Sequence, residues 1–100
     1  MTRTRETHRR IQAEIAREKA AALGRAGERL EAALEIVASL GRRLDVARDA
    51  TERARLLGEY EDARARALHA RLALVIQREA VGLRHHATVD AGYPEPPRRA

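Results

Sequence analysis

One hundred residues suffice for one small domain, and a formal net charge of +5 makes the chain basic. Ala and Arg dominate with 21 and 19 residues and aromatic residues make up only 2%, a composition that favours helices over strands and predicts an all-α fold. The absence of cysteine excludes disulfides and thiolate metal sites, and no apolar stretch approaches about 20 residues, the length that crosses a bilayer, so we expect a cytoplasmic protein without a membrane partner.

The first predicted helix covers residues 6–40. Its apolar residues recur in alternating steps of three and four, a 3.5-residue repeat that is typical of a helix packed along another helix in a coiled coil. Gly24 and Gly27 fall inside this helix and each costs about 1 kcal/mol relative to Ala, so we expect a close helix crossing to account for them. The stripe consists of Leu23, Ala26, Leu30, Ala33, Val37, Leu40, Leu44 and Ala47, with Leu34 beside it and Ile15 and Ala16 as its extension toward the N-terminus.

A bend is predicted within residues 41–49. Gly41 is a candidate end for the first helix, although the stripe continues beyond it and would allow the helix to reach Arg48. Asp49, with Glu52 three residues later, has the pattern of a capping box. This pattern predicts the start of a second helix over residues 50–81.

The apolar stripe of the second helix broadens toward its C-terminal end. Residues 72–76 read Leu-Ala-Leu-Val-Ile, and consecutive apolar residues cover most of the circumference of a helix. One partner helix cannot cover such a surface. We expect Gly82 to end the second helix, a short helical turn within residues 83–92, and a non-helical tail rich in Pro and Arg at residues 93–100.

These elements predict a long antiparallel hairpin of two helices of similar length, about 32 residues or 48 Å each at 1.5 Å per residue. A lone hairpin has one shared seam and no third layer for the broad end of the second helix. We therefore expect it to self-associate, as a four-helix-bundle homodimer, or to dock on a larger protein. The residues expected at packing or interface positions are Leu23, Leu30, Leu34, Val37, Leu40, Leu57, Tyr60, Leu68, Leu72, Val75 and Ile76.

No pattern in the sequence predicts a catalytic, metal or cofactor site. His85 and His86 are adjacent, and neighbours on a helix point about 100° apart, so they lack the spacing of zinc ligands. Glu59, Glu61 and Asp62 are followed by arginines, which is typical of a solvated ion-pair face rather than of general acid–base catalysis. We expect a protein that is not an enzyme and that holds no metal and no cofactor.

The polar residues after the apolar run allow two interpretations. In an antiparallel hairpin they lie beside residues 11–19 of the first helix, where Glu79 could form a buried pair with Arg17 that fixes the register. Alternatively, residues 77–84 are a hydrated helix end. The second interpretation is favoured.

Three segments resemble an uncharacterised family of short bacterial all-helical proteins, grouped as a domain of unknown function. They are residues 22–31 (ALGRAGERLE), residues 77–84 (QREAVGLR) and the pair Tyr93-Pro94. The similarity covers about residues 12–95 and implies a helical fold. It transfers no activity and no functional residue to this chain.

The leading functional hypothesis is a helical protein–protein interaction or structural module that self-associates. The alternative is a small nucleic-acid-associated protein, since the excess positive charge lies at the two ends of the chain and residues 11–97 contain equal numbers of acidic and basic residues. Phosphate binding favours a contiguous basic stripe, whereas we expect these ends to be frayed and residues 1–5 to be disordered, which disfavours the alternative. The residues that would contact nucleic acid are Arg3, Arg5, Arg9 and Arg10.

Overall fold

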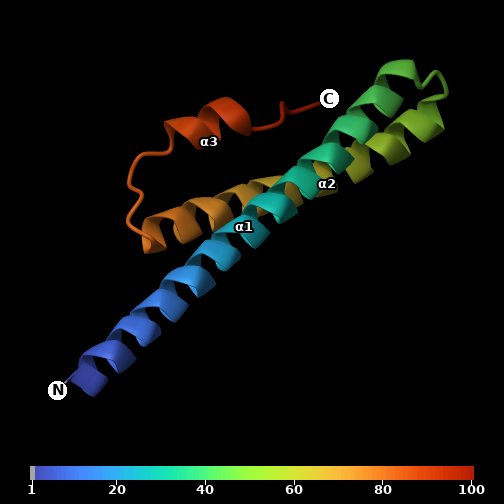
Figure 1. Cartoon of the computed structure of the whole chain (residues 1–100). Helices are drawn as coiled ribbons and strands as arrows, with labels where there is room; N and C mark the ends of the chain where they lie inside the picture. Colours follow the sequence, from blue (N-terminus) through green and yellow to red (C-terminus); the bar gives the residue numbers. More distant parts are fainter. Residues whose placement is uncertain (1) are drawn as a thin grey trace.

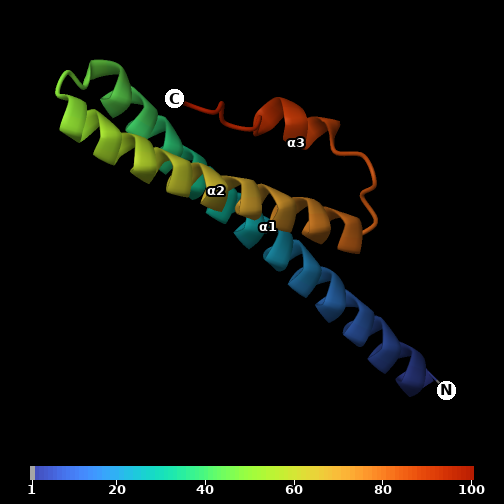
Figure 2. The same cartoon turned by 180° about the vertical axis from the view of Figure 1, so that it is seen from behind.

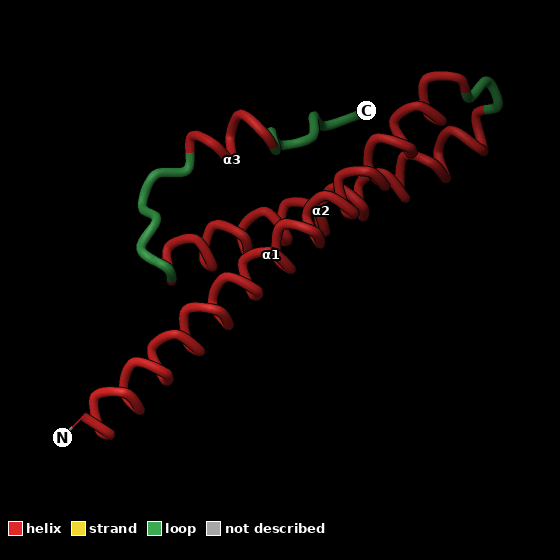
Figure 3. Tube along the Cα trace, in the orientation of Figure 1, coloured by secondary structure: helices red, strands yellow, loops and turns green. Residues whose placement is uncertain are grey.

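Two long helices pack side by side as an antiparallel hairpin in the computed structural model, which describes Thr2–Ala100 (Figure 1). Helix α1 covers Thr2–Val46 and α2 covers Ala50–Ala80, followed by a short helix α3 at Ala87–Gly92 and a non-helical tail (Figure 3). The molecule is elongated, measuring 74 × 21 × 14 Å. The all-α hairpin with a short C-terminal helix, predicted from the sequence, is confirmed.

Helix α1 is longer than predicted at both ends. The prediction of two helices of similar length is wrong, because α1 has 45 residues and α2 has 31. The sequence predicts disorder for residues 1–5, whereas α1 begins at Thr2, and the Thr7 hydroxyl donates a hydrogen bond to the Arg3 carbonyl in its first turns at 2.9 Å. Met1 lies outside the described residues. At the other end α1 passes Gly41 because Leu44 is still buried in the seam with α2.

The turn between the two long helices is therefore shorter than predicted, with only residues 47–49 outside them. The Asp49 carboxylate accepts a hydrogen bond from the Glu52 backbone N–H at 2.9 Å, which confirms Asp49 as the N-cap of α2. The Arg53 guanidinium donates to the Leu44 carbonyl at 3.1 Å. One arginine thus satisfies a free carbonyl at the end of α1 and ties it to the start of α2.

The end of α2 is set by a Schellman motif. Gly82 has a φ of +90°, its N–H donates to the Glu79 carbonyl at 3.0 Å, and the Leu83 N–H donates to the Arg78 carbonyl at 2.9 Å. A side chain at this φ is strained, so glycine is required here. The prediction that Gly82 ends the second helix is confirmed.

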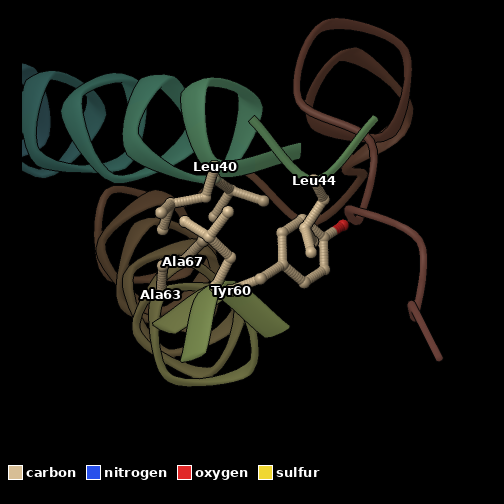
Figure 4. Packing of buried hydrophobic residues seen from close by; sticks show 7 residues of the cluster. Leu40, Leu44, Tyr60, Ala63 and Ala67 are labelled. Atoms are coloured by element: carbon tan, nitrogen blue, oxygen red, sulfur yellow. The ribbon is translucent and has the colours of Figure 1, made fainter. Parts of the chain in front are cut away.

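The core consists of two clusters along the seam. The turn-end cluster contains Val37, Leu40, Leu44, Leu56, Tyr60, Ala63 and Ala67, and the open-end cluster contains Ala26, Leu30, Leu74 and Val89. Figure 4 shows Leu40 packed against the small side chains Ala63 and Ala67, with the Tyr60 ring beside Leu44. The seam predicted from Leu23 onward is confirmed, but its extension through Ile15 and Ala16 is wrong, because α2 ends before reaching them and both are exposed.

The glycines inside α1 have no packing role in this hairpin. A Cβ added at Gly24 or at Gly27 would meet no atom within 4 Å. The close helix crossing expected to account for them is therefore wrong. At Gly41 a Cβ would make only ordinary contacts, 3.5 Å from Arg99 and 3.7 Å from Tyr60.

The substitution Gly27→Ala is accordingly expected to raise the free energy of unfolding by about 1 kcal/mol, because Ala restricts the unfolded chain and its methyl group meets no neighbour. Urea unfolding followed by circular dichroism at a fixed protein concentration measures the change. Gly82→Ala serves as the opposite control and is expected to destabilise, since Gly82 needs its positive φ. A destabilised Gly27→Ala protein would contradict the open surroundings described for this position.

Candidate interaction surface

The first half of α1 projects beyond the hairpin as a single helix. We call Thr2–Ala21 the N-terminal arm; every side chain in it is exposed, and α2 ends short of it (Figures 1 and 2). Two large apolar residues, Ile11 and Ile15, are 49% and 38% exposed on this arm. Within Thr2–Ala100 this long helical arm therefore has no packing partner.

One side of the hairpin is covered by the chain's own C-terminal tail. The Tyr60 hydroxyl donates to the Pro97 carbonyl at 2.6 Å, and the Arg64 guanidinium donates to the Pro96 carbonyl at 2.8 Å. Arg99 forms an ion pair with Asp45 at 2.5 Å. The expectation that this end is frayed is wrong, because these contacts anchor the tail along both helices.

Helix α3 covers part of the broad apolar end of α2. Val89 is buried in the open-end cluster, and Val75 and Tyr93 pack against the same cluster. The Arg71 side chain fixes this segment by donating to the Tyr93 carbonyl at 2.9 Å and by forming an ion pair with Asp90. A segment of the chain itself therefore supplies a third layer at this end.

The opposite side of the hairpin carries an open groove between α1 and α2. No residue of α3 or of the tail lines it. Its α1 wall includes the exposed side chain of Ile36, and its α2 wall carries Glu59 and Asp62. We call it the open groove; its lining residues are Ile36, Ser39, Leu40, Arg43, Glu59, Asp62, Ala63 and Arg66.

The residues predicted at packing or interface positions divide into three groups. Leu30, Val37, Leu40 and Tyr60 are buried inside the chain. Leu23, Leu34, Leu57, Leu68 and Val75 are partly buried. Leu72 and Ile76 are 57% and 56% exposed. Ile11 and Ile36 are not among the residues predicted from the sequence, although their spacing relative to the core stripe places them on the surface.

The polar residues considered in the sequence as buried partners or metal ligands lie at the surface near the end of α2. The buried pair of Glu79 with Arg17 is wrong: Glu79 is exposed, its carboxylate lies 3.5 Å from Nε2 of His86, and Arg17 belongs to the arm beyond the end of α2. Arg78 organises this end by donating to the His85 carbonyl and to Nδ1 of His86. Within Thr2–Ala100 no three His, Asp or Glu side chains are grouped to hold a metal ion.

The acidic cluster of α2 is exposed at all three of its residues, Glu59, Glu61 and Asp62. Glu59 pairs with Arg55, one turn earlier, at 2.9 Å. An exposed pair one turn apart is typical of a solvated charged helix face, as predicted for this cluster. None of the described helices is long and apolar enough to cross a membrane.

The contact between the tail and α1 has a pH signature. Glu31 raises the pKa of Tyr93 above its ordinary value of 10.0, since the phenol donates a hydrogen bond to the carboxylate at 2.5 Å, and desolvation and the negative charge act in the same direction. The bond favours the neutral phenol in the folded chain. Its contribution to stability is present below the pKa of a free tyrosine and is lost as the pH rises through the raised pKa.

The substitution Glu31→Ala is therefore expected to lower the pKa of Tyr93 toward that of a free tyrosine. Absorbance of the phenolate during a pH titration measures this change, with Glu28→Ala, an exposed glutamate on the same helix, as the matched control. An unchanged tyrosine titration in Glu31→Ala would mean that the tail does not dock on α1 in solution.

Comparison with known protein families, with curated proteins and with solved structures finds no match to this chain. The resemblance to an uncharacterised bacterial family therefore stays a prediction, and the function has to be argued from the surfaces described above.

Proposed function

We propose that this chain is a non-enzymatic helical module that acts by self-association, as a homodimer. The observation that carries the proposal is the N-terminal arm, a helix with two large apolar residues and many charged ones that has no packing partner among the described residues. An isolated helix of about 20 residues is only marginally stable in water, and most helical stability in proteins comes from packing an apolar face. The arm therefore needs a partner to persist as a helix.

The exposed apolar side chains of the hairpin support the same proposal. The chain covers one side of the seam with its tail and α3, yet leaves Ile36 and Ile76 each 56% exposed. Single exposed apolar residues are ordinary on a protein surface, but here they recur along the length of one elongated hairpin. The hairpin of a second copy can cover them.

Sedimentation equilibrium tests the proposal. We expect a mass of twice 11.2 kDa at micromolar concentration, and a loss of helical circular dichroism on dilution as the arm loses its partner. A mass of 11.2 kDa up to the highest soluble concentration, with unchanged helicity, would overturn self-association.

A second candidate is nucleic-acid association through the arm, favoured by the exposed arginines in its first turns, Arg3, Arg5, Arg9 and Arg10. Titration with a DNA duplex at 50 and 200 mM salt tests it, because phosphate contacts give a steep salt dependence. Tight binding that is lost at high salt and on replacing the four arginines with Gln would support this candidate. Binding that survives the replacement would exclude the arm as its cause.

A further inference from the structure

We propose that the open groove is the docking site for the N-terminal arm of a second copy, with the α1 helices of the two copies packed antiparallel. This inference rests on the proposed self-association and adds the surface and the register. The apolar pattern of the arm and the groove sets one register, and their lengths and charges agree with that register.

The apolar match comes from a second 3.5-residue repeat on α1. From Ala22 onward each of its positions lies one residue before a core position, which turns it about 100° around the helix from the seam with α2. All of its residues except the partly buried Ala22 are exposed. The second repeat consists of Ile11, Ile15, Glu18, Ala22, Arg25, Arg29, Ala32, Ile36, Ser39 and Arg43.

This repeat is complementary to itself when two copies run antiparallel. The register that places Ile11 opposite Ile36 of the second copy also places Ile15 opposite Ala32 and Glu18 opposite Arg29. Beside the axis, Ala22 lies opposite Arg25. Each match occurs twice, because a two-fold dimer repeats every contact. Isoleucines thus meet apolar residues at both ends of the interface, and an ion pair lies nearer the middle on each side of the axis.

Neighbouring registers lack this complementarity. A shift of one heptad in either direction sets Ile11 opposite Arg29 or opposite Arg43 of the second copy. The second of these shifts also sets Arg25 opposite Arg29, which places like charges together. The pattern of α1 therefore selects one register.

The length match follows from the same register. Thr2 of one copy lies opposite Asp45 of the other, so the two 45-residue helices overlap from end to end. The arm, Thr2–Ala21, then lies beside residues 26–45 of the second copy, which is the part of α1 that forms the hairpin. This explains why α1 exceeds α2 in length: the extra residues of each copy complete the groove of the other.

The charge match concerns the α2 wall of the groove. The heptad positions that form the seam with α2 continue into the arm, but there they hold Arg5 and Arg9 in place of apolar residues. In a two-fold pair these positions lie on the side of the arm that faces α2 of the second copy. Asp62 lies next to Ala63, which packs against Leu40, so it is close to the level of Arg9 of the arm in this register. Glu59, one turn earlier on α2, is level with Arg5. The groove residue Arg43 lies opposite the neutral Thr4.

The two-fold axis of the proposed dimer also accounts for the exposure of Ile76 on α2. Leu74 lies in one cluster with Ala26 and Leu30, so Ile76, two residues further along α2, lies near the level at which the two-fold axis passes. Both α2 helices lie on the same side of the α1 pair, so their C-terminal ends meet there with Ile76 of each copy near the axis. Leu72 remains outside this contact.

A charge exchange tests the register. The single variants Glu18→Arg and Arg29→Glu each create two repulsive contacts and are expected to raise the dimer dissociation constant about tenfold or more, and the double variant is expected to restore it. Within one chain these two residues are too far apart along α1 to pair, so rescue reports contact between copies. Glu35→Arg, an exposed glutamate on another side of α1, is the control and is expected to leave the dimer unchanged.

Cysteine cross-linking gives a second readout that does not depend on the strength of one ion pair. The chain has no cysteine, so Ile11→Cys combined with Ile36→Cys is expected to oxidise to a covalent dimer, since the two positions are about 37 Å apart in one helix at 1.5 Å per residue. The control pair, Ile11→Cys with Val46→Cys, is expected not to cross-link.

Sedimentation of these proteins separates the two proposals. A dimeric natural chain with neither charge rescue nor cross-linking would overturn this interface and leave self-association standing. A natural chain that is monomeric at every concentration would overturn both. Charge rescue together with selective cross-linking supports the interface.

Discussion

Replacing Leu30 with Ala is expected to lower the free energy of unfolding by about 2–5 kcal/mol. Leu30 is fully buried in the open-end cluster, where it joins α1 to Leu74 of α2 and to Val89 of α3. Removing three carbon atoms loses their burial and leaves a cavity that three packed elements cannot close without moving apart. Since a small domain has a total stability of about 5–15 kcal/mol, this loss is a large share, and α3 is expected to detach first.

Leu72→Ala is the matched control, because it removes the same atoms from a side chain that is 57% exposed. We expect it to change the free energy of unfolding by about 0.5 kcal/mol or less. Urea unfolding at a fixed protein concentration compares the two, since the stability of a dimer depends on concentration. Equal losses in both variants would show that Leu72 is covered in the assembled protein, against the dimer proposed above.

Those parts of the fold that depend on local pattern could be predicted from the sequence. The 3.5-residue repeat from Leu23 to Ala47 identifies the seam, and Asp49 and Gly82 mark the two ends of α2 through caps formed within a few residues of each. These signals are local because the hydrogen bonds that they describe are local.

The position of the tail could not be predicted, because its partners leave no pattern in the sequence. Tyr60 and Arg64 donate to the carbonyls of Pro97 and Pro96, and a backbone carbonyl is present whatever the residue. Val89 is the one buried side chain of helix α3, and a single apolar residue in a short polar segment gives no sign that the segment packs on the hairpin. Long-range contacts of this kind become visible only in the folded chain.

The dimer surfaces proposed above could not be predicted from the sequence for a different reason. The second repeat on α1 alternates isoleucines with Glu18, Arg25 and Arg29, so it does not stand out by hydropathy. Two helices of equal length would also set the start of the first against the end of the second, and this arrangement would bring Ile15 into the seam. Only the unequal lengths of α1 and α2 leave the arm free and make the second repeat relevant.

Replacing Ala67 with Leu is expected to destabilise the fold by overpacking the seam between α1 and α2. Ala67 is 1% exposed, and with Ala63 it forms the small-residue contact against which Leu40 packs. Three added carbon atoms at this position have no space between the helices, so α1 and α2 must move apart or the side chain must leave its preferred rotamer. Overpacking of this kind costs about 1–3 kcal/mol, and occasionally more.

The matched variant Ala65→Leu adds the same atoms two residues away, where the side chain is exposed, and is expected to be nearly neutral. Thermal unfolding by circular dichroism measures both, and a tolerated Ala67→Leu would contradict the close approach of the helices. The substitution also reaches the open groove, because Ile36 lies on α1 and Asp62 on α2. Spreading the two helices moves the two walls apart, so the arm of a second copy can no longer contact both, and Ala67→Leu is expected to weaken dimerisation as well as folding.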